Sequence, residues 1–240
     1  CARVRARAMA ARPRTLTISV APILAAVAHA YGATGRIAIL PVLAALVAAI
    51  AIQIATNLFN DAADGERGHD GPARLGPARV TGLGLLSAAD VKRAALMACG
   101  VAALAGLVAF QAGGWPILAI GIASLIAGWA YSNGPLPIAM TPLGEVFVIL
   151  FFGVAAVCGT AYLANPAAIS GQTLVLGVAT GLPAAAVLTV NNHRDRALDR
   201  RNGRRTLAIL LGVAGSRALF TALLLASVAL TALPTLALAG

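Results

Sequence analysis

Charged side chains are scarce in this sequence: Asp, Glu, Lys and Arg make up 11 % of its 240 residues, against roughly a quarter in an average soluble domain. Apolar residues make up 60 %, and the mean hydropathy is +0.87. Such a chain has too few polar groups to cover a surface in water, which excludes an ordinary soluble globule, and it is too apolar for a disordered segment. The composition predicts a single membrane-embedded domain over residues 1–240.

Cysteine is also scarce, and its few positions exclude two kinds of site. Cys1, Cys99 and Cys158 show no paired spacing and lie mostly in apolar runs, so neither a disulfide framework nor a zinc site is indicated. The chain begins with Cys1 rather than Met and ends at Gly240 inside an apolar run. We therefore expect the sequence to be a piece of a longer protein.

Long apolar runs are what the sequence has in abundance. Seven of them reach the length of about 20 residues that a membrane-spanning helix needs, and their many small residues favour close helix packing in lipid. The predicted fold is an all-α, polytopic transmembrane helix bundle with about seven spans. The predicted spans cover residues 15–33, 37–59, 94–112, 115–132, 144–164, 172–190 and 216–239.

The charges predict the orientation of the bundle. The net charge of +10 comes from 18 basic and 8 acidic residues, and 17 of the 18 basic residues lie on one side of the predicted spans, with Arg36 as the exception. An excess of Lys and Arg marks the cytoplasmic side. We therefore expect a protein of the bacterial cytoplasmic (inner) membrane with a cytoplasmic N-terminus. Topology accounts for the basic excess, so nucleic-acid binding is not indicated.

Two connections, about residues 57–93 and 191–215, are longer and richer in charge than the others, and both are predicted to face the cytoplasm. Each begins with acids and amides at the spacing of one helix face. Carboxylates this close repel one another unless a cation lies between them, and Asp and Asn oxygens suit a hard cation such as Mg²⁺. We expect both faces to enclose one cavity. The residues on these faces are Asn57, Asn60, Asp61 and Asp64 in the first, and Asn192, Asp195 and Asp199 in the second.

Arginines are interleaved with these acids and can bind phosphate oxygens bidentately. Mg²⁺ in proteins typically combines one or two carboxylates with substrate phosphates, and the apolar bundle offers space for a hydrocarbon tail. The pattern is typical of a Mg²⁺-diphosphate site, and the alternative is a pair of solvated loops with incidental ion pairs. Glu145 has two interpretations as well: a charge favoured at a helix N-terminus, or a polar residue facing a cavity.

These motifs resemble those of the UbiA-type intramembrane aromatic prenyltransferases, and most closely the branch that prenylates 1,4-dihydroxy-2-naphthoate in the menaquinone pathway. The resemblance runs from about residue 12 to the end of the chain. Its most specific parts are Asn60-Asp61-x-x-Asp64 and Asn191-Asn192-x-Arg194-Asp195-x-x-x-Asp199-x-x-x-Gly203. Further matches are Arg12-Pro13-Arg14-Thr15-Leu16, Arg74-Leu75-Gly76-Pro77, Leu143-Gly144-Glu145-Val146-Phe147 and Gly203-Arg204-Arg205-Thr206-Leu207.

The resemblance implies a fold of nine spans, of which the last two are missing here, and Mg²⁺-dependent binding of a polyprenyl diphosphate by both acidic motifs. Its implied catalytic residues are Asp61, Asp64, Asp195 and Asp199, which with Asn60 also form the implied metal site. The expected substrate-binding residues are Asn57, Asn60, Asn191, Asn192, Arg194, Arg204 and Arg205, with Arg14 and Lys92 added from position alone. The family often has a third Asp where this chain has Gly68, and Asp70 is the nearest substitute.

The reaction implied by the closest branch joins a polyprenyl group to the naphthoate ring, with loss of CO₂ and pyrophosphate, and gives demethylmenaquinol. Three alternatives stay open. Another aromatic acceptor, such as 4-hydroxybenzoate, is one. A CDP-alcohol phosphotransferase is another, although its Asp-Gly-x-x-Ala-Arg signature is not found after Asp64. A transporter is the third, although its ionisable groups are expected near the bilayer midplane. Prenyl length and oligomeric state are not indicated.

Overall fold

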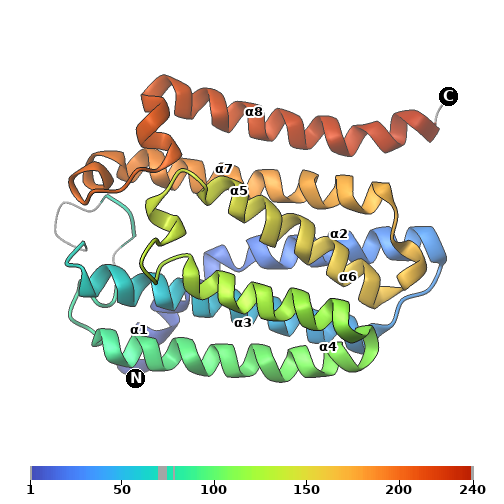
Figure 1. Cartoon of the computed structure of the whole chain (residues 1–240), viewed down its shortest axis with the longest axis horizontal. Helices are drawn as coiled ribbons and strands as arrows, with labels where there is room; N and C mark the ends of the chain where they lie inside the picture. Colours follow the sequence, from blue (N-terminus) through green and yellow to red (C-terminus); the bar gives the residue numbers. More distant parts are fainter. Residues whose placement is uncertain (1, 70–74, 78, 239–240) are drawn as a thin grey trace.

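The structure is a computed structural model that describes residues 2–69, 75–77 and 79–238, and its regular elements over these residues are all helical. The long helices run along the longest axis of the molecule (Figure 1). Cys99 and Cys158 are free thiols, and Cys1 lies outside the described residues. The elements are α1 (Ala2–Ala11), η1 (Pro13–Thr15), α2 (Thr17–Thr34), α3 (Ile39–Glu66), α4 (Ala88–Ala130), η2 (Ile138–Met140), α5 (Gly144–Val148), the π-helix η3 (Ile149–Ala155), α6 (Ala156–Ala164), η4 (Pro166–Ala168), α7 (Gly171–Arg201) and α8 (Leu207–Leu238).

Within the described residues, six helical segments are long and apolar enough to cross a membrane. One of them, the 43-residue α4, contains two of the seven predicted spans. Gly114 interrupts it with φ 64° and ψ −155°, a conformation that glycine adopts without steric cost. The two halves of α4 run in opposite directions in Figure 1. The predicted all-α bundle is confirmed, and all seven apolar runs correspond to these segments.

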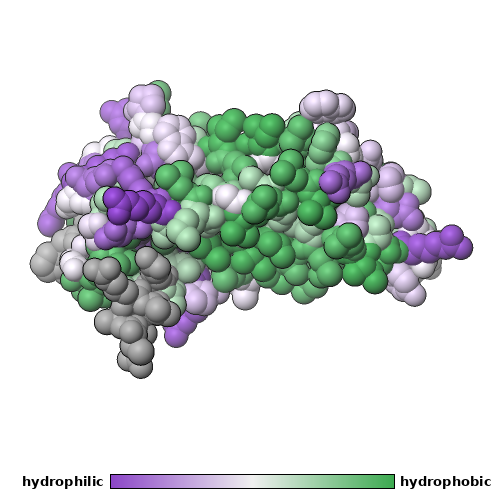
Figure 2. Space-filling view, turned by 90° about the horizontal axis from the view of Figure 1, so that it is seen from below, coloured by the Kyte–Doolittle hydropathy of each residue, from purple (hydrophilic) through white to green (hydrophobic). Residues whose placement is uncertain are grey.

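The surface is divided by polarity along the same axis. Apolar residues cover the middle of the face shown in Figure 2, and hydrophilic residues gather at its two ends. Many large apolar side chains are exposed on the helices, among them Leu104 and Ile126. A water-soluble monomer rarely exposes so large an apolar surface, whereas a lipid bilayer accommodates it.

Helices α3 and α7 are longer than a span requires, and their extra turns carry the two polar motifs. They have 28 and 31 residues, whereas about 20 are enough to cross the hydrocarbon core. The first motif occupies the last turns of α3 and the second the last turns of α7, at the same end of the molecule (Figure 1). In these two connections, only residues 67–87 and 202–206 therefore lie outside the long helices.

Glycines let η3 lie directly against α7. A Cβ atom on Gly177 would lie 2.9 Å from Val154 Cα, and one on Gly181 would lie 2.9 Å from Ile149 Cα. A Cβ on Gly153 would collide with the carbonyl oxygen of Gly177. Such backbone-to-backbone contact is a common way of packing helices in lipid, where dispersion and not water exclusion holds them together.

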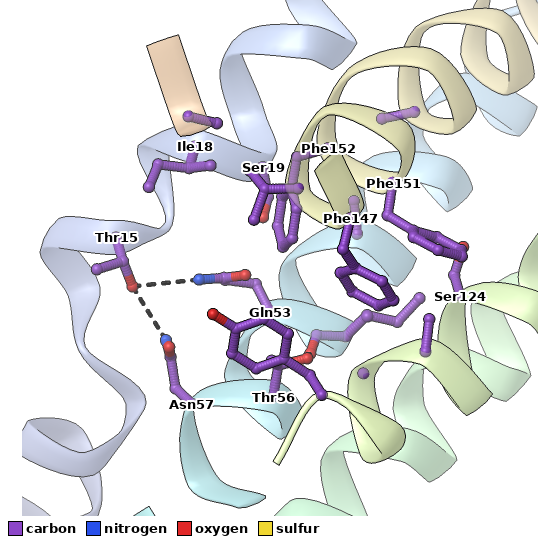
Figure 3. Close-up of a pocket in the computed structure, with 18 of the residues that line it drawn as sticks. Thr15, Ile18, Ser19, Gln53, Thr56, Asn57, Ser124, Phe147, Phe151 and Phe152 are labelled. Atoms are coloured by element: carbon purple, nitrogen blue, oxygen red, sulfur yellow. Dashed lines mark hydrogen bonds between the residues drawn. The ribbon is translucent and has the colours of Figure 1, made fainter. Parts of the chain in front are cut away.

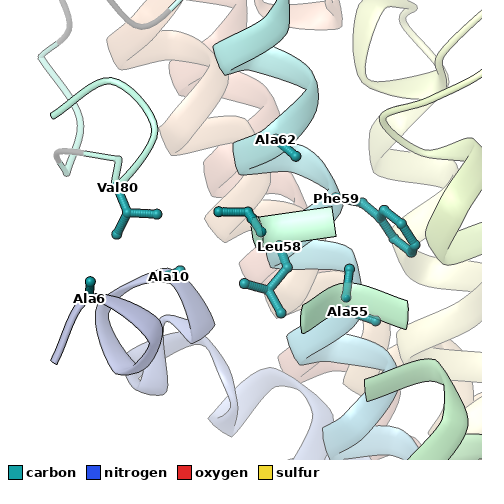
Figure 4. Packing of buried hydrophobic residues seen from close by; sticks show 9 residues of the cluster. Ala6, Ala10, Ala55, Leu58, Phe59, Ala62 and Val80 are labelled. Atoms are coloured by element: carbon teal, nitrogen blue, oxygen red, sulfur yellow. The ribbon is translucent and has the colours of Figure 1, made fainter. Parts of the chain in front are cut away.

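Helix α1 packs across the polar end of α3 and closes that side of the bundle. Its buried Ala6 and Ala10 belong to one apolar cluster with α3 and with Val80 of the following connection (Figure 4). The cluster fixes both the N-terminal segment and the chain near residue 80 beside the first motif. Its α3 members are Ala55, Leu58, Phe59 and Ala62.

Candidate active site

A cavity of about 610 Å³ extends from the polar end into the bundle. Both polar motifs contribute to its wall, as expected from their helical faces. Its inner part is lined by apolar and small side chains of α3, α4, α5, η3 and α6, such as Ala45, Ile117 and Ile120. The polar lining includes Asn57, Asn60, Asp61, Arg79, Asn191, Asn192, Arg194, Asp195, Asp199 and Arg204.

Asp64 joins the two motifs through arginines. Its side chain is buried, with Oδ1 accepting a hydrogen bond from Arg204 Nη2 at 2.5 Å and Oδ2 lying 2.5 Å from Arg79 Nη1. Arg204 also pairs with Asp199, whose Oδ1 lies 3.5 Å from Arg204 Nε. A buried carboxylate needs such partners to offset its lost hydration. Asp64 itself is not part of the cavity lining, whereas Arg79 and Arg204 are.

The carboxylates of Asp64 and Asp199 stabilise the positive charge of Arg204. Burial by itself lowers the pKa of the guanidinium, but the attraction of Asp64 and Asp199 outweighs burial, so the pKa of Arg204 is raised. Arg204 therefore remains a cation at neutral pH. It places a fixed positive charge in the cavity wall, between the ends of α3 and α7.

Arg194 and Asp195 form a second ion pair in the wall. Arg194 Nε and Nη2 donate to Asp195 Oδ1 and Oδ2 at 2.9 and 2.8 Å, a bidentate geometry. The guanidinium also lies against Gly76, where an added Cβ would be 2.6 Å from Nη2. The second motif thus contacts the connection that follows the first one, and a glycine at position 76 leaves the space for it.

Asp61 and Asn57 fix neighbouring segments, and Asn60 keeps an oxygen unpaired. Asp61 Oδ2 accepts from the Val80 backbone N–H at 3.2 Å, and Oδ1 accepts from the backbone N–H and hydroxyl of Thr81 at 3.2 and 2.5 Å. Asn57 Nδ2 donates to Thr15 Oγ1 at 3.0 Å (Figure 3). Asn60 Oδ1 is buried and, among the described residues, has no hydrogen-bond partner.

Two expected substrate-binding residues lie away from the cavity. Lys92 Nζ pairs with the carboxylate of Glu66 at 2.7 and 2.8 Å on the exposed surface. Arg205 is exposed, and its backbone N–H donates to Met140 O at 2.8 Å. Arg14, by contrast, lines the cavity. Asp70, the nearest substitute for a third motif Asp, lies outside the described residues.

The donor chemistry of the wall fits a hard cation that arrives with a phosphate-bearing ligand. In the described part of the chain, no three His, Cys, Asp or Glu residues are grouped so that they could hold a metal ion by themselves. Mg²⁺ requires fewer protein ligands, since it typically takes one or two carboxylates together with substrate phosphates. The unpartnered Asn60 Oδ1 and the carboxylates of Asp195 and Asp199 meet that requirement in one cavity.

Three neighbouring aromatic rings, of Tyr131, Phe147 and Phe151, form an aromatic wall in the cavity. The ring centroids of Tyr131 and Phe147 are 5.7 Å apart, and those of Phe147 and Phe151 are 4.6 Å apart. All three rings line the cavity, with Phe147 and Phe151 side by side in Figure 3. Burial, followed by the nearby charge of Glu145, raises the pKa of the Tyr131 phenol, so that its hydroxyl stays protonated.

The model of the UbiA prenyltransferase family matches residues 19–240 of this chain. The chain belongs to the UbiA prenyltransferase family. With its apolar helices and this membership, it is an integral membrane protein. The 1,4-dihydroxy-2-naphthoate octaprenyltransferase of Mycobacterium tuberculosis (strain ATCC 25618 / H37Rv) is 38 % identical over 225 residues, which cover 92 % of this chain and 75 % of that protein. The protein of that name from Escherichia coli (strain K12) is 35 % identical over 228 residues, which cover 92 % of this chain and 73 % of that protein.

Solved structures of UbiA homologues share the fold. The homologue from Archaeoglobus fulgidus bound to GPP and Mg²⁺ has a TM-score of 0.70 at 16 % identity, covering 93 % of this chain and 75 % of that one. The apo homologue from Aeropyrum pernix K1 has a TM-score of 0.67 at 19 % identity, and the match covers 91 % of this chain and 78 % of that one.

Sequence reasoning assigned no site role to several residues that line this UbiA cavity. Arg79 is buried and donates to Asn60 O at 2.7 Å besides pairing with Asp64, but a single arginine in a connection has no spacing that singles it out. Arg12 also lines the cavity, with φ 52°, the one positive φ among the described non-glycine residues. Nothing local in the sequence marks that conformation. Tyr131 and the phenylalanines lay within predicted spans, where aromatic residues are ordinary.

Proposed function

We propose that this chain transfers a polyprenyl group from a polyprenyl diphosphate to 1,4-dihydroxy-2-naphthoate, with loss of CO₂ and pyrophosphate, giving demethylmenaquinol for menaquinone biosynthesis. The observation that carries the proposal is one cavity with acids and arginines at its polar end and apolar side chains inside. Such a cavity suits a substrate with an anionic head and a hydrocarbon tail. The relatives named for this reaction support the choice of acceptor.

Oxygen donors at the polar end would hold Mg²⁺ together with the diphosphate. Asn60, Asp195 and Asp199 line the cavity, and Asp64 lies behind them with its two arginines. When bound, Mg²⁺ would neutralise charge that develops on the pyrophosphate leaving group. Asp61 would support this set by holding the backbone of Val80 and Thr81 in place. The structure of the Archaeoglobus fulgidus homologue bound to DMAPP and Mg²⁺ supports such a pairing.

The arginines of the wall would bind the diphosphate oxygens that the cation leaves free. Arg79, Arg194 and Arg204 each pair with a carboxylate, so their guanidinium groups are already placed before a substrate arrives. Charge-assisted hydrogen bonds from arginine to phosphate are strong and directional. The carboxylates keep the site near neutrality. When a cation and an anionic diphosphate arrive together, the carboxylates can bind the cation and the arginines can bind the diphosphate.

The aromatic wall would protect the reacting carbon. As the allylic C–O bond breaks, positive charge develops on the prenyl carbon, and ring faces such as those of Phe147 and Phe151 attract a cation. The apolar interior excludes water, which would otherwise capture that carbon. The electron-rich acceptor ring then forms the new C–C bond, and its carboxylate leaves as CO₂.

Release of CO₂ tests the proposal. With the protein in membranes, carboxyl-labelled dihydroxynaphthoate, polyprenyl diphosphate and Mg²⁺ should yield labelled CO₂ in step with prenylated product, and a chelator should stop both. A 4-hydroxybenzoate acceptor keeps its carboxylate when it is prenylated beside its hydroxyl. Prenylation of hydroxybenzoate without CO₂ release would overturn the naphthoate acceptor and leave the prenyl transfer standing.

A further inference from the structure

Glu145 is a buried acid with an unusual set of partners. It is the second residue of α5, only 3 % exposed, and its Oε1 accepts a hydrogen bond from Asn192 Nδ2 at 3.1 Å. Its Oε2 is buried with no hydrogen-bond partner among the described residues, and no described cation lies within ion-pair distance. A carboxylate in a membrane-spanning segment is costly, and those that occur usually serve a site.

The contact dictates which end of the Asn192 amide faces the cavity. An asparagine side chain has a donor end and an acceptor end of nearly the same shape, whereas a carboxylate only accepts hydrogen bonds. With its Nδ2 donating to Glu145, Asn192 keeps its Oδ1 as the end of the amide that Glu145 does not hold. Asn192 lines the cavity and Glu145 does not, so Glu145 influences the cavity through Asn192.

Asn192 lies where the polar end of the cavity meets the aromatic wall. It precedes Asp195 by one turn of α7, and it is bonded to a residue at the start of α5, which also contains Phe147. Tyr131 is close by, since a Cβ on Gly144 would lie 3.9 Å from the Tyr131 hydroxyl. A carbonyl oxygen at this point repels phosphate oxygens and attracts a hydrogen-bond donor attached to a ring.

We infer that Glu145 is a positioning residue, which orients Asn192 so that its Oδ1 accepts a hydrogen bond from a phenolic hydroxyl of the aromatic acceptor. The inference rests on the proposed function and adds the group that recognises the acceptor. One directional hydrogen bond at the ring edge, with the ring against Phe147, fixes which ring carbon faces the prenyl carbon.

Glu145→Gln tests this role, because the glutamine NH₂ group can donate to Asn192 Oδ1. The Asn192 amide is then free to flip, with its NH₂ group toward the cavity. We expect the KM for the acceptor to rise about tenfold, the equivalent of one ordinary hydrogen bond, and the KM for polyprenyl diphosphate to stay unchanged. Asn192→Ala should show the same split. In the double variant, Glu145→Gln should add nothing to Asn192→Ala, and Glu145→Asp should restore part of the acceptor affinity. Glu66→Gln, which removes an exposed acid outside the cavity, is the matched control.

The inference is overturned by an unchanged acceptor KM in Glu145→Gln, by equal rises in both KM values, or by a further loss from Glu145→Gln in the Asn192→Ala background. If Glu145→Gln does not accumulate in membranes, Asn192→Ala alone decides, since an unchanged acceptor KM in that variant contradicts the role. If the wild-type protein prenylates hydroxybenzoate instead of the naphthoate, the proposed acceptor is wrong. The same comparison is then made with hydroxybenzoate, which also has a phenolic hydroxyl.

Discussion

At the scale of single residues, the polar end is a set of buried and half-buried charges that neutralise one another. Asp64 has an arginine on each oxygen, and Asp195 has a bidentate one. Removing one partner from a buried pair leaves an uncompensated charge, which costs far more than an exposed pair contributes. The motif acids therefore hold the arginines in place as well as providing oxygen ligands.

Replacing Asp64 or Asp199 by Asn tests whether each acid is needed for turnover. Each single variant should lower kcat/KM by at least about 100-fold, the scale of losing one preorganised charge partner at a reacting centre. If the acids act as one unit with the metal and diphosphate, the double variant should be little worse than either single variant. Initial rates in membranes with matched amounts of inserted protein provide the measurement. Activity near the wild-type level in a single variant would assign that acid to structure alone.

At the scale of secondary structure, the π-helix η3 and the glycines of α7 set the shape of the cavity. The wider π-turn and the backbone contact at Gly153, Gly177 and Gly181 bring η3 against α7. The same segment carries Phe151 of the aromatic wall, which lines the cavity, and Phe152, which packs against apolar residues of α7. The packing of η3 against α7 therefore also fixes the position of Phe151 in the aromatic wall.

Gly153→Ala should disrupt this packing. The added methyl group meets the backbone of α7, which cannot move aside as a flexible side chain can. We expect a loss of about 3 kcal/mol in the free energy of unfolding, the upper end of the usual range for overpacked sites. Thermal unfolding in detergent measures the loss. Gly100→Ala is the matched control, because no atom lies within 4 Å of its added Cβ and alanine is the better helix former. Equal unfolding temperatures for the two variants would contradict the predicted contact.

Gly121 should limit the length of the prenyl chain. It lines the apolar part of the cavity, and an added Cβ meets no atom within 4 Å. In Gly121→Phe the added Cβ therefore meets no packed neighbour, and we expect the ring to take up cavity space. We expect shorter prenyl diphosphates to be used as well as by the wild type and the longest ones to lose kcat/KM by about tenfold or more. Competition between diphosphates of two lengths gives the ratio. An unchanged ratio would place the tail elsewhere.

At the scale of the whole molecule, the polar motifs share one end of an apolar bundle. Figure 2 shows the apolar band between the two hydrophilic ends, and Figure 1 places the ends of α3 and α7 together. Most basic residues of the sequence lie in the segments at this end, and an excess of Lys and Arg marks the cytoplasmic side of a membrane protein. We propose that the polar end faces the cytoplasm of a bacterial cell.

Cysteine labelling tests this orientation. In a background without native cysteines, Arg201→Cys near the second motif should resist a membrane-impermeant thiol reagent added to intact cells. Ala167→Cys, an exposed position at the opposite end in η4, should be labelled. After the cells are opened, both should react. The reverse pattern would invert the bundle, because the charge asymmetry alone supports the present orientation.

Much of the protein was accessible from its sequence because the relevant signals are local. Apolar run length predicts membrane spans, and a helical period predicts which side chains share a face. These rules placed the helices, the polar turns of α3 and α7, and a cavity shared by Asp195, Asp199 and Asn60. They also selected Lys92 and Arg205, which lie outside the cavity lining, since position in a charged connection does not reveal where a long side chain points.

The sequence by itself determined the membrane class, the order of the spans and the chemistry of the motifs, since composition and periodicity follow from the order of residues alone. Only the tertiary structure decided which polar side chains contact one another. Asp64 meets Arg204 across 140 positions, Arg79 turns inward beside it, and Glu145 meets Asn192 from another span. These contacts depend on how far each helix is rotated and how closely the glycines let η3 approach α7. Packing between distant segments sets both quantities, and no local pattern records them.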